Sequence, residues 1–163
     1  KFKSAAPNPY YWAGNEHDFL APYLFNFGPN CTNSQYWSRK VNEMHFTNTP
    51  HGIPGNEDYG SMSTWLLFSS LGFFPNAGTS KFLIGSPRVQ KATLKLRHWN
   101  SDYSTIEVIT YNNSAENVFV EKLLVNGEEY KQPFIDRSVL ANPAGVKLEF
   151  FMHSEPTSNL CRA

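Results

Sequence analysis

The sequence predicts an α+β protein in which a helical part is followed by a part made of β-strands. Before about residue 78 apolar residues recur at helical spacing, and after it they alternate with polar residues as in strands. Long connections rich in glycine and proline separate the helical segments, and an Asn-Gly pair at 126–127 signals a hairpin turn. We therefore expect two regions, residues 1–78 and residues 79–163, the second folded as antiparallel strands of a β-sandwich.

Three helices are expected in the first region, over residues 16–27, about 33–45 and about 59–72. The first begins after Asn15 as a candidate N-cap and stops at Gly28. The third is apolar nearly all round, which is typical of a helix buried on most sides. The second has an apolar face and a polar face, which carry Trp37, Val41 and Met44, and Ser38, Arg39 and Asn42, respectively.

These helices do not make a complete bundle. Three helices, one of them apolar on almost every side, cannot cover one another within about 75 residues. They look like part of a larger helical array, so we expect the chain to be a fragment of a larger protein. The strands that follow are expected around residues 91–96, 106–108, 118–120 and 146–150.

The composition excludes several classes of function. Lys+Arg 14 balances Asp+Glu 14, and charged residues make up only 17% of the chain. Nucleic-acid binding usually needs a basic face, and a membrane-surface anchor needs a polybasic segment. The longest apolar stretches, such as residues 65–68, are far shorter than the roughly 20 residues of a transmembrane helix. We therefore expect neither nucleic acid nor a membrane as a partner.

Two cysteines and two glycosylation sequons bear on the compartment. Cys31 and Cys161 could bridge each other, pair with groups outside the chain, or remain buried thiols. Asn30 opens an Asn-Cys-Thr sequon and Asn112 an Asn-Asn-Ser sequon, although ordinary polar turns have the same composition. Together these features favour a secreted protein, with N-glycans at Asn30 and Asn112 as a further expectation.

Two clusters of acidic and amide residues lie at the starts of expected helices, at 14–18 (Gly-Asn-Glu-His-Asp) and 55–60 (Gly-Asn-Glu-Asp-Tyr-Gly). One interpretation is helix capping, in which these side chains accept hydrogen bonds from free N–H groups. The other is functional. If consecutive helices pack antiparallel, the first and third run the same way and both clusters emerge at one end of the bundle. Oxygen ligands converging there would suit calcium, and a carboxylate could act as acid or base in hydrolysis.

Other side chains near these clusters are also candidates. His51 lies in the long Gly/Pro-rich connection before the third helix, where it could contact a substrate. Trp12, with Tyr10 and Tyr11 before it, could stack on a sugar ring or could simply line the helix packing. The histidines show no paired metal-ligand spacing, and the chain has neither a nucleophile elbow nor a Gly-rich phosphate loop.

Four segments, in order along nearly the whole chain, are similar to motifs of one known family. Residues 12–16 (Trp-Ala-Gly-Asn-Glu), with 22–26 after them, resemble its Gly-Asn-Glu-Pro segment. Residues 52–63 resemble its Gly-Leu-Pro-Gly-Asn-Asp-Asp-x-Gly-Gln-Met-Ser motif, and residues 65–75 resemble its Trp-Tyr-Val-Phe-Ser-Ala-Leu-Gly-Phe-Tyr-Pro helix. Gly-Ser-Pro at 85–87 matches the tripeptide that opens its final strands. The chain therefore resembles glycoside hydrolase family 92, the calcium-dependent exo-α-mannosidases.

The resemblance implies a large enzyme with an N-terminal β-sandwich, an (α/α)6 barrel and closing strands. Residues 1–78 would then be the last helices of the barrel, and residues 79–163 the C-terminal strands. The activity implied is inverting hydrolysis of α-linked mannose, with α-1,2 as the expected linkage and an α-mannoside or N-glycan as the substrate.

The resemblance also assigns roles to residues of this chain. By its place in the motif Asp58 would be the general base. Asn15, Glu16 and Asp58 would surround a calcium ion that holds the mannose hydroxyls at C2 and C3, with the Gly14 carbonyl as a further ligand. The substrate-binding side chains would be Trp12, His51 and Glu57.

One catalytic group is missing from the chain. An inverting pair of carboxyl groups lies roughly 6.5–9.5 Å apart, and the family's general acid lies upstream of the Gly-Asn-Glu segment. None of the fifteen residues before Glu16 is acidic. The remainder of the same enzyme, on a separate chain or segment, would have to supply the acid.

The chain departs from the family pattern at three positions near this site. His17 stands where the family usually has Pro, Phe19 where it often has His, and Asn56 where some members have Asp. The first two bear on linkage specificity. A second interpretation is a non-catalytic module that binds mannose through calcium without cleaving it, and a third is a purely structural β-sandwich with a helical appendage.

Overall fold

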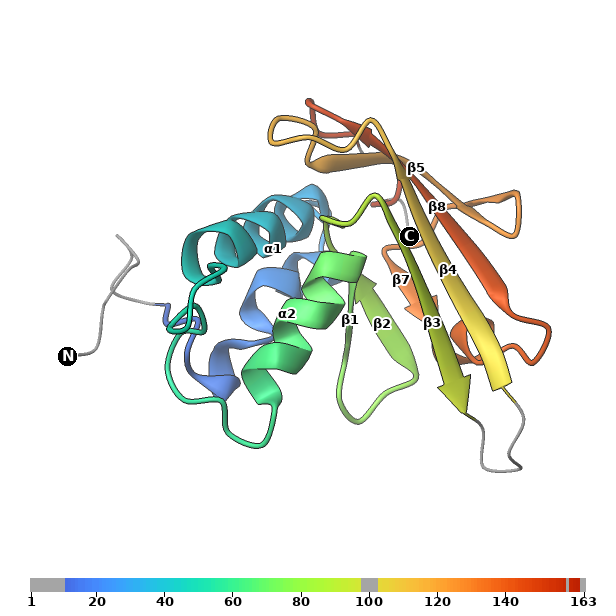
Figure 1. Ribbon diagram of the computed structural model, residues 1–163. Helices are drawn as coiled ribbons and strands as arrows, with labels where there is room; N and C mark the ends of the chain where they lie inside the picture. The colour runs from blue at the N-terminus through green and yellow to red at the C-terminus, as the bar shows by residue number, and fades with distance from the viewer. Residues whose placement is uncertain (1–10, 98–102, 158, 162–163) are drawn as a thin grey trace.

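The computed structural model describes residues 11–97, 103–157 and 159–161, and in it the helical elements of residues 16–71 lie to one side of a β-sandwich (Figure 1). The helical elements are the 3-10 segments η1 (Glu16–Asp18) and η2 (Ala21–Phe27) and the α-helices α1 (Thr32–His45), α2 (Ser61–Leu71) and α3 (Arg137–Leu140). The strands are β1 (Phe73–Pro75), β2 (Lys81–Ile84), β3 (Lys91–Arg97), β4 (Tyr103–Tyr111), β5 (Phe119–Val125), β6 (Glu128–Tyr130), β7 (Phe134–Asp136) and β8 (Val146–His153). Within the part of the chain described, no helix is long and apolar enough to cross a membrane.

The strands form a three-stranded sheet in the order β1-β2-β7 and a five-stranded sheet in the order β3-β4-β8-β5-β6. Neighbouring strands are antiparallel except for β4 and β8, which run parallel with Ile106 opposite Val146. The expectation of antiparallel strands is therefore wrong for this pair. A parallel pair needs a long connection, and here the chain passes through β5, β6, β7 and α3 between the two strands.

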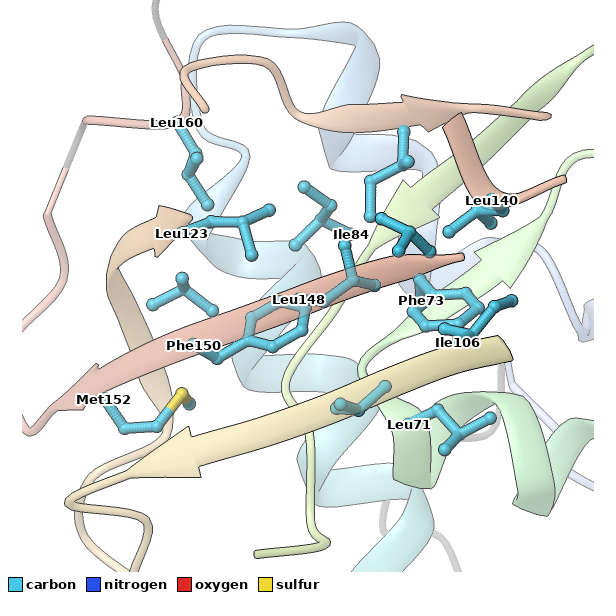
Figure 2. Close-up of a cluster of buried hydrophobic side chains, with 14 of the residues drawn as sticks. Leu71, Phe73, Ile84, Ile106, Leu123, Leu140, Leu148, Phe150, Met152 and Leu160 are labelled. Carbon is cyan, nitrogen blue, oxygen red and sulfur yellow. The ribbon is translucent and has the colours of Figure 1, made fainter. Parts of the chain in front are cut away.

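Apolar side chains from the two sheets meet in one core (Figure 2). From Val146 to Met152 buried and half-buried residues of β8 alternate. Leu148 and Phe150 point inward, and each is 0% exposed. Phe73 and Ile84 face them from the smaller sheet, each 1% exposed. The period-two pattern correctly predicted the inward positions of Leu148 and Phe150, because every second side chain of a strand lies on the same face. The strand at Phe73, however, begins before the expected boundary at residue 78, and the boundary itself stays a prediction.

The expected first helix over residues 16–27 is wrong in form. The structure divides it into η1 and η2, and Pro22 lies in the first turn of η2. Proline has no N–H to donate to a preceding turn, so a helix that started near Glu16 cannot run through it. Asn15 does occupy the N-cap position of η1, but its side chain makes no capping bond, and Gly28 ends η2 as expected.

Helix α1 buries its polar face and exposes much of its apolar face. Arg39 is 5% exposed and Asn42 is fully buried, whereas Trp37 is 44% and Met44 is 45% exposed. A surface helix of a complete domain normally does the reverse. Val41 on the apolar face is buried, but Trp37 and Met44 are left uncovered by the described residues, which supports the expectation of a fragment.

The polar face of α1 is held by hydrogen bonds to the sandwich. Arg39 donates from Nε to the Ser86 hydroxyl at 3.2 Å and from Nη2 to the Asn113 side chain at 2.6 Å, and it also bonds the carbonyl of Pro87. Burial lowers the pKa of the Arg39 guanidinium to about 10, although Glu43 beside it acts in the opposite direction. The group therefore stays charged at neutral pH and needs every one of these acceptors.

Helix α2 is bounded by two glycines in the left-handed region, Gly60 with φ 85° and Gly72 with φ 91°. Met62 and Trp65 are buried inside the helical part, where Trp65 stacks on the Phe46 ring with 5.2 Å between centroids. Leu67, however, is 52% exposed. The expected burial of this helix on most sides is thus incomplete in the chain by itself.

A disulfide joins the start of α1 to the C-terminal end of the chain. Cys31 and Cys161 are bonded with their Cα atoms 5.2 Å apart, so the bridging alternative is the correct one. The tail before Cys161 runs beside β5, where Thr157 donates to the carbonyl of Val120 at 3.2 Å. The bond therefore fastens the helical part, the sandwich and the tail together.

We expect Cys31→Ser to lower the free energy of unfolding by about 2–5 kcal/mol, because a cross-link across a long loop restricts the unfolded chain. Denaturant unfolding of the intact protein with and without a reductant measures this. Cys161→Ser should have the same effect, and the double variant should be little worse than either single one. A wild-type protein whose unfolding midpoint ignores the reductant would contradict the prediction.

Candidate functional site

The two acidic clusters lie against each other through a contact between glycine backbones. A Cβ atom added to Gly55 would lie 2.5 Å from the carbonyl oxygen of Gly14, and one added to Gly14 would lie 2.8 Å from the nitrogen of Gly55. Gly55 also has a backbone φ angle of 67°, which residues other than glycine rarely adopt. The sequence therefore needs glycine at both positions to bring the segments 14–18 and 55–60 side by side.

The first segment is a compact turn stabilised by Asp18. Its Oδ2 accepts hydrogen bonds from the Trp12 backbone N–H at 3.4 Å and from the Asn15 side chain at 3.2 Å. The side-chain oxygen Oδ1 of Asn15 lies 3.3 Å from Nδ1 of His17, which is exposed. The Trp12 indole covers Gly14, because a Cβ there would lie 2.8 Å from the indole nitrogen. Both Trp12 and Asn15 are therefore held close to the glycine contact.

Two carboxylate oxygens at this contact are buried without a donor. Glu57 accepts a hydrogen bond on Oε1 from the N–H of Ser63 at 3.0 Å, which caps the start of α2. Its other oxygen, Oε2, and Oε1 of Glu16 are buried and have no hydrogen-bond partner among the described residues. The capping interpretation is thus right for one oxygen of Glu57 but accounts for neither of these. Buried oxygens normally have a partner, so both are candidates to bind a cation or a sugar hydroxyl.

Asp58 lies on a turn whose backbone is held in an unusual conformation. Asp58, Tyr59 and Gly60 have φ 41°, 60° and 85°, and the two side chains are exposed. Ser61 stabilises the turn because its hydroxyl donates to the carbonyl of Asp58 at 2.6 Å. Non-glycine residues in this region are strained by roughly 1–3 kcal/mol each, and such strain concentrates at functional sites. The turn presents the Asp58 carboxylate outward, where it is free to meet a substrate.

The long connection before α2 forms an open cleft beside the second segment. The connection folds back on itself in a tight turn, in which the Thr47 N–H donates to the carbonyl of Gly52 at 2.9 Å and the Gly52 N–H donates to that of Thr49 at 3.0 Å. The cleft has a volume of about 460 Å3 and is lined by Thr47, Thr49, Pro50, His51, Gly52, Ile53, Gly55, Glu57 and Leu66. It brings together His51 and Glu57, two of the expected substrate-binding residues.

The expected metal ligands include only two carboxylates, Glu16 and Asp58. Among residues 11–97, 103–157 and 159–161, no group of three or more His, Cys, Asp or Glu side chains is placed to hold a metal ion. The other ligands of a calcium ion would therefore be the Asn15 amide, a backbone carbonyl or groups from outside the described part of the chain. The donor chemistry still fits calcium, since the available oxygens are carboxylate and amide oxygens.

Two residues near the site have packing roles that the sequence did not indicate. Phe19 packs edge-on against Phe74 with 6.5 Å between ring centroids, and its carbonyl accepts the Trp65 indole N–H at 3.1 Å, so it stabilises the helical part.

His45 is the buried histidine that sequence reasoning missed. It lies edge-on to Trp12 with 6.5 Å between centroids, its Nδ1 has no partner among the described residues, and burial lowers its pKa. Its position at the end of α1, next to an aromatic segment, was the available signal. Tyr10 lies outside the described residues.

These two glycine-linked segments carry the motifs of a known enzyme domain. Residues 2–154 match the Glycosyl hydrolase family 92 catalytic domain. The chain belongs to glycosyl hydrolase family 92. The family match includes both acidic segments, the cleft and most of the sandwich.

Known family 92 proteins are similar to this chain in sequence and in fold. A family 92 α-mannosidase from Bacteroides thetaiotaomicron, solved with mannoimidazole, is 31% identical with a TM-score of 0.81 over 94% of this chain. An inverting mannosidase of the family from the same organism is 26% identical, with a TM-score of 0.69 over 89%. An uncharacterized secreted glycosidase of Arthroderma benhamiae is 28% identical over 147 residues, which is 90% of this chain. The chain spans about a fifth of the length of these proteins, 20%, 19% and 19%, respectively.

We expect Gly55→Ala to weaken the site far more than a matched glycine variant does. Gly78 has φ 79°, close to that of Gly55, but a Cβ there would meet nothing within 4 Å. Gly78→Ala should therefore lower the free energy of unfolding by about 1–2 kcal/mol through backbone strain alone. Gly55→Ala carries the same strain and also forces the two segments apart.

Denaturant unfolding and turnover of the intact enzyme measure this difference. Gly55→Ala should be the less stable variant and should lose turnover, whereas Gly78→Ala should keep it. Equal stability and equal turnover of the two variants would show that the glycine contact does not set the geometry of the site.

Proposed function

We propose that the chain is the C-terminal part of a secreted, calcium-dependent inverting exo-α-mannosidase that hydrolyses α-linked mannose, with α-1,2 as the expected linkage. The observation that carries the proposal is the backbone contact of Gly14 with Gly55, because it joins the two family motifs into one site. The solved relatives include an α-mannosidase and an inverting mannosidase. N-glycans, which carry α-linked mannose, are the proposed natural substrates.

Asp58 is the proposed general base. In an inverting hydrolysis the base takes a proton from the water that attacks the anomeric carbon, while an acid on the opposite side protonates the leaving oxygen. The outward, preset position of the Asp58 carboxylate suits the first task, since the side chain is exposed and its backbone is fixed by Ser61. The acid belongs to the part of the enzyme outside this chain.

Glu16, Asn15 and Asp58 are the proposed calcium ligands, with the Gly14 carbonyl beside them. A bound calcium ion would supply positive charge that holds two mannose hydroxyls and favours distortion of the ring. The support for this set is the buried Oε1 of Glu16, which has no partner among the described residues, and the side-chain oxygen of Asn15 on the same turn, which lies 3.3 Å from Nδ1 of His17.

The cleft is the proposed sugar-binding surface. His51 and Glu57 line it, and Oε2 of Glu57 is a buried acceptor without a donor among the described residues. Trp12 is proposed to contact the sugar from the facing segment, although its ring also packs on Gly14. His17, exposed next to Asn15, is the departure from the family pattern that remains close enough to affect linkage.

The rest of the enzyme is proposed to cover the exposed apolar side of η2 and α1. A groove of about 500 Å3 lies there, lined by Tyr11, Ala21, Pro22, Phe25, Tyr36, Trp37, Lys40, Val41, Met44 and His45. An apolar surface of this kind normally has a partner, and about four-fifths of the length of the relatives lies outside this chain. The helical elements within residues 1–78 would then be the last helices of an (α/α)6 barrel. Export of the enzyme is supported by the disulfide and by the secreted relative.

We expect Asp58→Asn in the intact enzyme to lower kcat by at least about 100-fold, because general base catalysis contributes about 100- to 10,000-fold. Mannose release from α-1,2-mannobiose measures this. Glu128→Gln removes an exposed carboxylate of the sandwich and should leave turnover unchanged. Near-normal turnover of Asp58→Asn would remove this residue from the base role.

Calcium should be required for turnover and should stabilise the intact enzyme. We expect a chelator to stop mannose release and added calcium to restore it. A free calcium concentration of about 100 times the Kd should also add about 2.7 kcal/mol to the free energy of unfolding, which is measured as a rise in Tm. In Glu16→Gln this rise should shrink, whereas Glu128→Gln should keep it. A Tm indifferent to calcium would contradict the metal proposal, and calcium-dependent mannose binding without release would favour the non-catalytic module.

A further inference from the structure

The connection between β4 and β5 presents one asparagine side chain to solvent. Asn112 follows directly on the last residue of β4, is exposed, and has φ 58°. Asparagine tolerates this left-handed conformation better than most residues do. No described residue makes a hydrogen bond to its side chain, and its carbonyl accepts the Asn117 side chain at 2.8 Å. Asn112 is therefore fixed through its backbone while its amide group stays free.

The next two residues of the same sequon have the opposite role and build the turn. Asn113 points inward, where its side chain accepts from Arg39 at 2.6 Å and donates to the carbonyl of Val89 at 3.3 Å. The Ser114 hydroxyl accepts the backbone N–H groups of Glu116 at 3.1 Å and Asn117 at 3.0 Å. The two adjacent asparagines are thus distinguished by the fold, and only the first has a side chain available for modification.

We propose that Asn112 carries an N-linked glycan. The proposal rests on the proposed export of the enzyme, because the modification is made in the secretory pathway. There the Asn112 amide nitrogen forms a bond to the anomeric carbon of an oligosaccharide carried on a polyprenyl diphosphate. The bond from that carbon to the diphosphate oxygen breaks, the diphosphate leaves with the electron pair, and the amide loses one proton. Ser114 supplies the hydroxyl residue of the sequon.

The location of Asn112 permits a glycan after folding. The side chain is exposed, so the sugar extends into solvent without displacing any packed group. Figure 1 places the β4–β5 connection at one end of the molecule and the start of α2 at the other, so the glycan leaves the cleft open. Asn30 is a weaker case because the next residue, Cys31, is buried and disulfide-bonded.

The test uses the intact enzyme secreted from a eukaryotic host. Protein collected from the medium is treated with a glycan-removing amidase in heavy-oxygen water, which converts a glycosylated asparagine to labelled aspartate, and the peptides are weighed by mass spectrometry. We expect label at Asn112 in the wild type and in Ser114→Thr, which keeps the sequon. We expect its loss in Ser114→Ala, with mannosidase turnover unchanged.

A second variant keeps the test clear if Ser114→Ala folds poorly. Asn112→Asp leaves the Ser114 bonds intact and tolerates the same backbone angle, so it should be secreted without a glycan at this position. Secreted wild-type protein with unmodified Asn112, or with a glycan on Asn30 only, would overturn the proposal. Absence of the enzyme from the medium would instead overturn the proposed export, and secreted glycosylated protein without turnover would count against the proposed activity alone.

Discussion

The buried polar face of α1 is the contact on which the position of the candidate site depends. Arg39 and Asn42 lie inside the molecule and bond the Ser86 and Ser69 hydroxyls, at 3.2 and 2.6 Å, while Gln35 accepts the Val120 N–H at 2.8 Å. Loss of one partner would leave a buried polar group unsatisfied, at a cost of about 1–3 kcal/mol. Because α1 leads directly into the connection that forms the cleft, fixing this helix on the sandwich also fixes where the cleft begins.

The site itself is made by loops, and glycine rather than a side-chain interaction brings them together. Gly14 and Gly55 allow a backbone approach that any Cβ would prevent. The positions of Glu16 and Glu57 depend on this approach, because each lies two residues after one of the glycines. The segments 14–18 and 55–60 are therefore compatible both with helix capping and with a functional site. Glu57 caps α2 with one oxygen, and its other oxygen is buried without a partner among the described residues, so capping does not account for the whole side chain.

Local patterns predicted most of the fold, and long-range pairings were beyond them. The alternation in β8 and the Asn126-Gly127 turn, with φ 52° and 86°, depend on neighbouring residues and were read correctly. The parallel pairing of β4 with β8 depends on where distant segments meet, which period two cannot reveal. Pro22 did signal the interruption of the first helix. The two faces of α1 were correctly separated, but their orientation could not be deduced, because a local pattern predicts a buried apolar face and here Trp37 and Met44 are exposed.

The disulfide has a consequence for how the enzyme is made. Its two cysteines are 130 residues apart, and Cys161 is the third residue from the end of the sequence. At about 5–20 residues per second, ribosomes need roughly 7–26 seconds to add the residues between them. Throughout that time the Cys31 thiol waits unpaired at the start of α1, open to the wrong partner. The helical part can thus dock early through its polar face, but it is locked only after Cys161 has emerged.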